Sequence, residues 1–138
     1  ENQAKGLWQH NCLEVFIANK NQSAYLEFNG SSTQQSDVFV FIGERVNGQG
    51  VKTSEHILPT CATQAQWQWF YTQTSNHQAM AKFSLDLTSV ADVIDTTQPI
   101  EYSVTAVVED RQGQHYYLAL QHCRSEADFH ARESFGRV

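Results

Sequence analysis

Two segments near the start of the chain, residues 7–17 and 25–29, alternate between apolar and polar side chains. Because successive side chains of a strand point to opposite faces, this alternation predicts two neighbouring strands. One face of each strand is apolar, and the other carries a carboxylate, Glu14 in the first strand and Glu27 in the second. The pattern predicts a hairpin with one polar surface, around which the rest of the chain is organised.

Further segments also have the character of strands. Residues 38–42 form an apolar run typical of a strand buried on both faces, and residues 66–74 place Trp67 and Trp69 on one parity. Residues 79–87 alternate, residues 88–94 have the pattern of one helical turn, and residues 100–108 and 115–122 predict a second hairpin. Gly113 supplies the positive φ for its turn. The tail, 124–138, is expected to pack across the sandwich and end as an edge strand.

Short strands, turns about every 8 to 12 residues and no helix of ordinary length predict an all-β fold. We expect one domain over residues 1–138, an antiparallel β-sandwich or jelly roll. The net charge of −6 and the nine scattered Lys and Arg residues argue against a nucleic-acid partner. No apolar run approaches the roughly 20 residues of a membrane span, so no membrane partner is expected.

The three cysteines are an odd number and have no CxxC spacing. This pattern favours reduced thiols and hence a cytoplasmic protein. The chain begins at Glu1 and not at a methionine, which leaves export from the cytoplasm as an alternative.

The polar face of the opening hairpin and the tail together form the first candidate site. Carboxylates on neighbouring strands repel unless a cation, an arginine or ligand hydroxyls lie between them, and Arg132 is the expected partner of Glu14 and Glu27. Such a cluster is either a structural network that pins the tail to the sheet or a polar floor for a hydroxyl-rich ligand. Its members are His10, Glu14, Glu27, His122, Asp128, His130 and Arg132.

The second candidate set consists of aromatic residues, Trp8, Trp67, Trp69 and Tyr71. A sugar ring packs its C–H groups on an aromatic face while its hydroxyls need carboxylates, amides or arginine. The alternative interpretation is that these rings fill the core, as tryptophans usually do.

Four blocks of the sequence, in this order, resemble the DOMON-like bacterial proteins related to family 9 carbohydrate-binding modules. They are residues 7–16, residues 25–29, residues 106–109 with Gly113 and residues 117–122, and residues 127–132 with Phe135. The resemblance implies a β-sandwich that binds sugars, or haem in some DOMON relatives, at the sheet surface or rim. The family usually has one or two strands before the first block. The resemblance therefore implies a missing N-terminal strand and an exposed edge at residues 7–17, through which a homodimer would form.

Metal and catalytic chemistry have weaker signals. Related modules often hold a structural calcium, and the loop carboxylates Asp92, Asp95, Glu109 and Asp110 are its candidates, but they form no dense cluster. Zinc bound by Cys12 or Cys123 with a nearby histidine, and haem bound through the single methionine Met80, are further alternatives. We therefore expect no cofactor, with structural calcium left open.

Catalysis is not expected. His10 and Cys12 lie two apart on one strand face, about 7 Å from each other and too far for proton transfer. Glycosidase chemistry by Glu14 and Glu27 would need a cleft, of which the sequence gives no sign. The sequence thus predicts a non-catalytic domain that binds a saccharide or small polyol. The alternatives are a structural, self-associating domain and, behind it, an enzyme.

Overall fold

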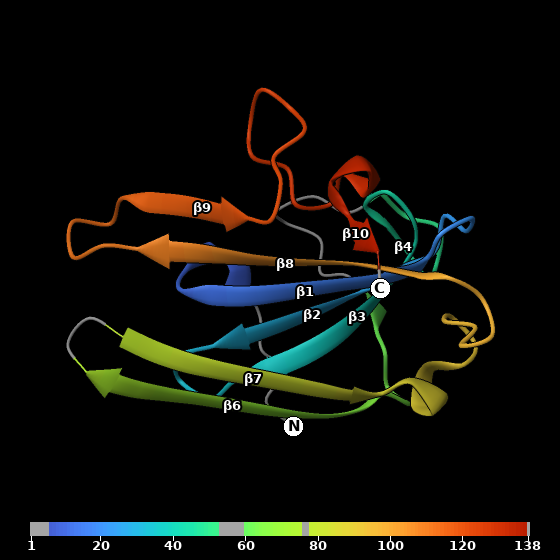
Figure 1. Ribbon diagram of the computed structural model, residues 1–138, viewed down its shortest axis with the longest axis horizontal. Helices are drawn as coiled ribbons and strands as arrows, with labels where there is room; N and C mark the ends of the chain where they lie inside the picture. Colours follow the sequence, from blue (N-terminus) through green and yellow to red (C-terminus); the bar gives the residue numbers. More distant parts are fainter. Residues whose placement is uncertain (1–5, 53–59, 76–77, 138) are drawn as a thin grey trace.

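The alternating segment near the N-terminus forms strand β1 (Cys12–Asn19), which pairs with β2 (Tyr25–Ser31) on one side and β8 (Ile100–Glu109) on the other (Figure 1). The computed structural model describes residues 6–52, 60–75 and 78–137, without the side chains of Trp8 and Arg137. The antiparallel register with β8 runs from Cys12 opposite Val107 to Asn19 opposite Ile100. β1 is therefore a central strand, and the prediction of an exposed edge there is wrong because β8 occupies it.

The main sheet has the order β10-β8-β1-β2-β3-β4, with β5 beside β3 and β9 beside β8. Its remaining strands are β3 (Ser36–Gly43), β4 (Val46–Asn47), β5 (Thr60–Cys61), β9 (His115–Ala119) and β10 (Gly136–Arg137). Gly113 has a φ of 80° in the β8–β9 turn, as predicted. The tail ends in β10 as an edge strand on β8, which confirms that part of the prediction.

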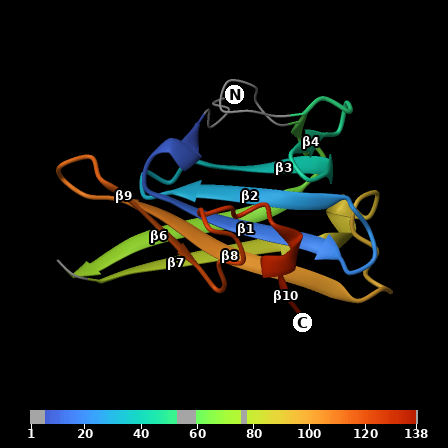
Figure 2. The same cartoon turned by 90° about the horizontal axis from the view of Figure 1, so that it is seen from above.

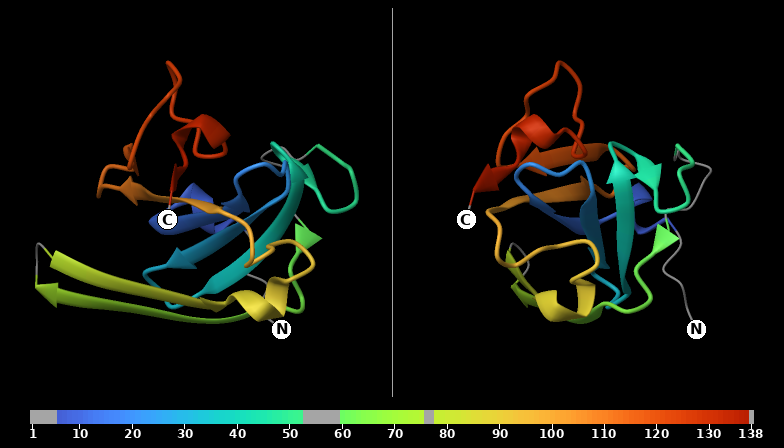
Figure 3. Two further views of the ribbon diagram at one scale, coloured as in Figure 1. Left: turned by 45° about the vertical axis from the view of Figure 1, so that its right-hand side comes forward. Right: turned by 90° about the vertical axis from the view of Figure 1, so that its right-hand side faces the viewer.

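The hairpin of β6 (Gln66–Ser75) and β7 (Gln78–Asp86) is a separate two-stranded sheet against one face of the main sheet (Figures 2 and 3). No α-helix occurs in the described ranges, and the all-β sandwich class is confirmed. The short turns are the 3-10 segments η1 (Leu7–Gln9), η2 (Leu87–Val90) and η3 (Arg132–Ser134). Residues 7–9 are thus not part of the first strand, which begins at Cys12. None of these helical turns has the length or apolar character of a membrane-crossing helix.

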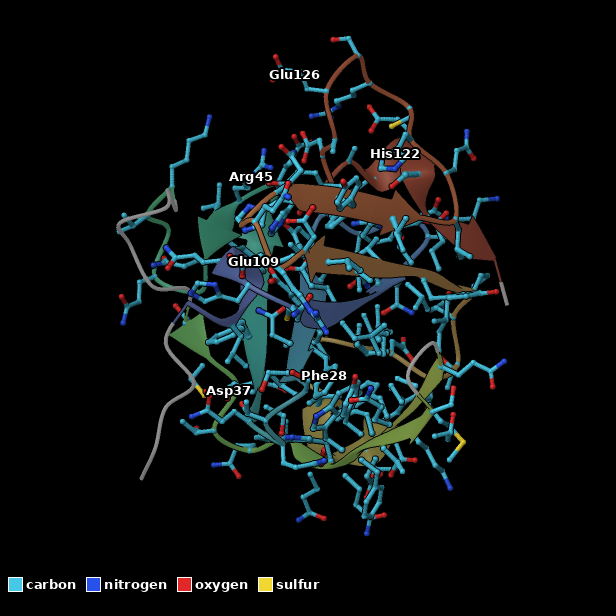
Figure 4. The ribbon with its side chains drawn as sticks, turned by 90° about the vertical axis from the view of Figure 1, so that its left-hand side faces the viewer. Phe28, Asp37, Arg45, Glu109, His122 and Glu126 are labelled. Carbon is cyan, nitrogen blue, oxygen red and sulfur yellow. The ribbon has the colours of Figure 1, made fainter. Side chains whose placement is uncertain are left out.

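Hydrophobic side chains pack on both faces of the main sheet. The face toward β6 and β7 buries Leu26, Phe28 and Val38 against Trp69. The other face buries Phe16, Tyr25, Phe39 and Phe41 against the tail residue Phe129. Figure 4 shows Phe28 on the side of the hairpin and Arg45 on the side of the tail. The hairpin β1–β2 therefore has no exposed polar surface, because the tail covers its carboxylate face.

Candidate functional site

The predicted polar face forms a buried carboxylate pair. Glu14 on β1 and Glu27 on β2 are each 4% exposed and lie on the same face of the sheet. Asn29 Nδ2 donates to Glu27 Oε1 at 2.8 Å, and Thr105 Oγ1 lies 3.4 Å from Glu14 Oε2. Burial, together with repulsion from Glu27, raises the pKa of Glu14 well above its ordinary value. Burial raises the pKa of Glu27 to about 7.

His130 connects the tail to this pair. The backbone N–H of Arg45 donates to Tyr25 Oη at 2.9 Å, which leaves the tyrosine O–H to donate to His130 Nδ1 at 2.7 Å. The imidazole proton is therefore on Nε2, which faces Glu27 Oε2 at 3.3 Å. Burial, and secondarily the charge of Arg45, lowers the pKa of His130 to about 3. The ring is accordingly neutral near pH 7, and its contact with Glu27 is not an ion pair.

Ion pairs hold the tail over this face. Asp128 accepts from Arg45 Nη2 at 2.8 Å and from Arg124 Nη1 at 2.6 Å, and Arg124 also pairs with Glu44 at 2.8 Å. Burial alone would raise the pKa of Asp128. The guanidinium groups of Arg45 and Arg124 outweigh this effect, and the pKa of Asp128 lies below its ordinary value. Sequence reasoning missed Arg45 and Arg124, which lie outside the predicted cluster.

Arg132 does not contact the buried carboxylates, and its predicted pairing with Glu14 and Glu27 is wrong. Its guanidinium donates to the carbonyls of Gln22 at 2.7 Å and Asn19 at 3.0 Å, and it lies 3.3 Å from Glu101 Oε2. The reason is that Arg132 is in η3, beyond His130, where the tail crosses the β1–β2 turn. It therefore ties the tail to that turn.

Two predicted histidines lie apart from the buried pair. His10 is exposed, and its Nδ1 is 2.8 Å from Glu109 Oε2. His122 is also exposed, and its Nε2 donates to the carbonyl of Tyr117 at 3.1 Å. Of the predicted tail residues, only His130 touches a carboxylate of the pair.

Trp67 and Trp69 lie on the opposite face of the main sheet. Trp69 is 9% exposed, packs on Phe28 and donates from Nε1 to the carbonyl of Ser31 at 3.1 Å. Trp67 is half-buried and donates to Ser36 Oγ at 3.0 Å. Trp8, the other tryptophan of the predicted set, has a side chain that lies outside the described part of the structure. The structure therefore separates Trp67 and Trp69 from the buried carboxylates, and Trp69 is a core residue.

A cavity of about 340 Å³ lies where the β1–β2 turn meets the loop before β8. Asn19 holds the two segments together, since its Nδ2 donates to the carbonyl of Asp95 and its Oδ1 accepts from the N–H of Asp95, both at 2.8 Å. Lys20 N donates to the carbonyl of Pro99 at 3.0 Å. We call this cavity the loop pocket. It is lined by Asn19, Lys20, Asn21, Gln22, Asp95, Gln98 and Pro99.

The polar groups of the loop pocket are available to a ligand. The side chains of Lys20, Asn21, Gln22 and Gln98 are exposed, and within the described part of the chain none of them makes a hydrogen bond. The Asp95 carboxylate accepts from the hydroxyl and the N–H of Thr97, which lowers its pKa and keeps it ionised. The sequence signals for this site were two polar turns, which only the β1–β8 pairing brings together.

The structure offers little for metal or thiol chemistry. Among the described residues, no three His, Cys, Asp or Glu side chains converge in a way that could hold a metal ion. Burial raises the pKa of the Cys12 thiol, so the thiolate needed for nucleophilic attack is not formed near neutral pH. Cys61 and Cys123 are also free thiols.

Comparison with known proteins gives no relative for this chain: no family model, no curated protein and no solved structure matches it. The resemblance to DOMON-like proteins therefore stays a prediction from the four sequence blocks.

Proposed function

We propose that this chain is a non-catalytic module that binds a saccharide or small polyol in the loop pocket. The observation that carries the proposal is the set of free polar side chains around a cavity of about 340 Å³. This volume is within the range of about 300 to 1,000 Å³ typical of small-ligand sites. The pocket replaces the carboxylate face as the proposed site, because that face is covered by the tail.

The chemistry of the pocket suits hydroxyl groups. Each sugar hydroxyl both donates and accepts, and amide side chains such as those of Asn21, Gln22 and Gln98 offer both functions. The carboxylate of Asp95 adds an acceptor, while the single cation, Lys20, is balanced by it. A neutral, hydroxyl-rich ligand therefore fits the pocket better than a phosphate or another anion. The ring of Pro99 supplies the apolar contact that the C–H groups of a sugar need.

The position of the pocket also supports this proposal. It lies at one end of the sandwich, on turns that the pairing of β1 with β8 fixes in place. Loops held by a rigid scaffold are common sites of recognition. The DOMON-like resemblance implies sugar binding at the sheet surface or rim, which agrees with this location.

Calorimetric titration with a panel of mono- and disaccharides and sorbitol tests the proposal. The variant Asn21→Ala/Gln98→Ala removes two free amides from the pocket. If each contributes a hydrogen bond of about 0.5 to 1.5 kcal/mol, affinity falls by about five- to one-hundred-fold. The matched control is Gln112→Ala/Gln121→Ala, which removes two exposed amides away from the pocket and should leave affinity unchanged.

Two results would contradict the proposal. Either no member of the panel binds, or the control variant weakens binding as much as the pocket variant. Unchanged melting temperatures of both variants show that any loss comes from the pocket and not from unfolding.

A further inference from the structure

An apolar strip lies exposed on the β8–β9 hairpin. Its residues, Val108, Tyr116, Leu118 and Leu120, are 40% to 61% exposed. The register places Leu118 beside Ala106 and Tyr116 beside Val108, so these side chains share one face. The β6–β7 hairpin packs on this same face of the main sheet, but over β2 and β3. It does so through contacts such as Phe28 with Phe83 and Trp67 with Ser36. The strip is therefore left without a covering layer in the described part of the chain.

The strip runs along an unprotected strand edge. In the described structure β9 pairs with β8 alone. Natural proteins protect such edges with lysine, other charges or proline, and His115–Ala119 contains none of these residues. Two exposed side chains of the described residues reach carbonyls on this edge: His122 Nε2 that of Tyr117 at 3.1 Å, and Gln114 Nε2 that of His115 at 3.2 Å. Surface hydrogen bonds of this kind are easily exchanged for others.

The backbone N–H and C=O groups of β9 alternate along the strand between those that face β8 and those that point to the open edge. Glu109 N donates to Asn11 Oδ1, on the β1 side of β8, and Tyr117 O faces His122, on the outer side of β9. The opposed pairs Glu109 with His115 and Val107 with Tyr117 therefore direct their N–H and C=O groups away from each other. His115, Tyr117 and Ala119 thus direct their backbone groups to the free edge.

We propose that β9 pairs antiparallel with β9 of a second copy of this chain, about a two-fold axis at Tyr117. This register is self-complementary, because Tyr117 meets Tyr117 of the second copy and His115 meets Ala119, each through backbone groups that point to the open edge. The side chain of Gln114 releases the carbonyl of His115 for this pairing. On the exposed face it places Tyr116 against Leu118 twice, so apolar side chains cover one another. The main sheet then continues through both copies, while the β6–β7 hairpins, over β2 and β3, remain far apart. His122 gives up the Tyr117 carbonyl to the second copy.

Sedimentation equilibrium of the intact chain tests the proposal. We expect concentration-dependent dimers for the wild type. For Leu118→Lys we expect a dimer dissociation constant at least about tenfold larger. Met80→Lys is the matched control, because Met80 is 62% exposed on a different sheet, and it should dimerise like the wild type. His122→Ala, which frees the Tyr117 carbonyl, should dimerise more tightly.

A cross-linking experiment keeps the proposal testable if Leu118→Lys fails to fold. In the Cys123→Ser background, Tyr117→Cys should form a disulfide-linked dimer, since residues opposite each other at such an axis have Cα atoms about 5.5 Å apart. His115→Cys should not, because it lies opposite Ala119. A wild type that stays monomeric, or equal cross-linking of both variants, overturns the proposal. The proposal is also overturned if Met80→Lys dissociates the dimer as much as Leu118→Lys does.

Discussion

The buried carboxyl groups of Glu14 and Glu27 make the stability of the fold depend on pH. The fold keeps a proton on Glu14 above pH 4.5, the ordinary pKa of a glutamate, where the unfolded chain has released it. The contribution of Glu14 to stability therefore falls as the pH rises above that value. His130 acts in the opposite direction, because its pKa of about 3 means that stability is lost as the pH falls below 6.5.

The substitution Glu14→Gln isolates the contribution of the Glu14 carboxyl group to the pH dependence of stability, since His130 is present in both proteins. The amide cannot ionise, so the variant escapes the cost of a buried charge at high pH. We expect its melting temperature to exceed that of the wild type by about 3 °C or more near pH 8, and by less near pH 5. Differential scanning calorimetry at both pH values measures this. A difference that does not change with pH contradicts the raised pKa.

His130 is expected to contribute more to the free energy of unfolding than its position in the tail suggests. His130→Phe keeps an aromatic ring among Phe16, Tyr25 and Phe41 but leaves the buried Tyr25 hydroxyl without its acceptor and Glu27 without its polar neighbour. We expect a loss of about 2 to 4 kcal/mol in urea unfolding. Tyr25→Phe removes the hydroxyl that joins the Arg45 N–H to His130 and should lower stability by a similar amount. Equal stability of His130→Phe and the wild type would show that the hydrogen-bond chain does not contribute.

At the residue scale, the sequence predicts which side chains share a face but not what covers that face. Strand parity placed Glu14 and Glu27 together and suggested the tail as their neighbour. Of the tail residues in the predicted cluster, His130 reaches Glu27 but Arg132 does not, because two residues along an irregular tail change where a side chain points. Parity carries no information about the Arg45 N–H, whose contact with Tyr25 depends on the β3–β4 turn.

The β6–β7 hairpin is seated on the main sheet at Gly30. A Cβ added there would lie 2.6 Å from Trp69 and 2.8 Å from Phe28, closer than packed atoms approach. Gly30→Ala must therefore push the hairpin outward, and we expect a loss of about 1 to 3 kcal/mol in urea unfolding. The matched control is Gly43→Ala, whose Cβ would meet only Val46 at 3.8 Å and should cost less than about 1 kcal/mol. Equal costs would contradict this packing.

The tail and the β1–β2 turn are coupled through Arg132. Its planar guanidinium reaches two carbonyls of the turn, at Asn19 and Gln22, and also Glu101. A lysine cannot span these partners, so Arg132→Lys should loosen the turn and speed hydrogen exchange at residues 19–23 several-fold. Saccharide affinity should fall although Arg132 does not line the loop pocket. Unchanged exchange in that turn would show that the tail does not position it.

At the element scale, alternation and turn residues predict nearly every long strand. The β8–β9 hairpin follows from Gly113, and Trp67 and Trp69 share one face of their strand, as predicted. Pairing between distant strands is what local patterns do not encode. β8 occupies the second edge of β1 from about 90 residues further along the chain, so the central place of β1 was not predictable from its own residues.

Across the whole molecule, the second layer is narrower than the sheet it covers. The β6–β7 hairpin lies over β2 and β3, the tail covers the opposite face, and the face of β9 stays exposed. This arrangement separates Trp67 and Trp69 from the carboxylates, which the sequence suggested as one site. It also creates the loop pocket, since residues 19–22 and 95–99 meet only once β1 and β8 are paired.

The most direct test of the proposed function is a map of backbone amide chemical shifts during titration with the saccharide panel. Binding in the loop pocket predicts that saturable shifts centre on residues 19–22 and 95–98, with His130 and Trp67 unaffected. Shifts centred on the tryptophans or on the tail, or no saturable shift with any saccharide, would contradict the assignment of the loop pocket as the binding site.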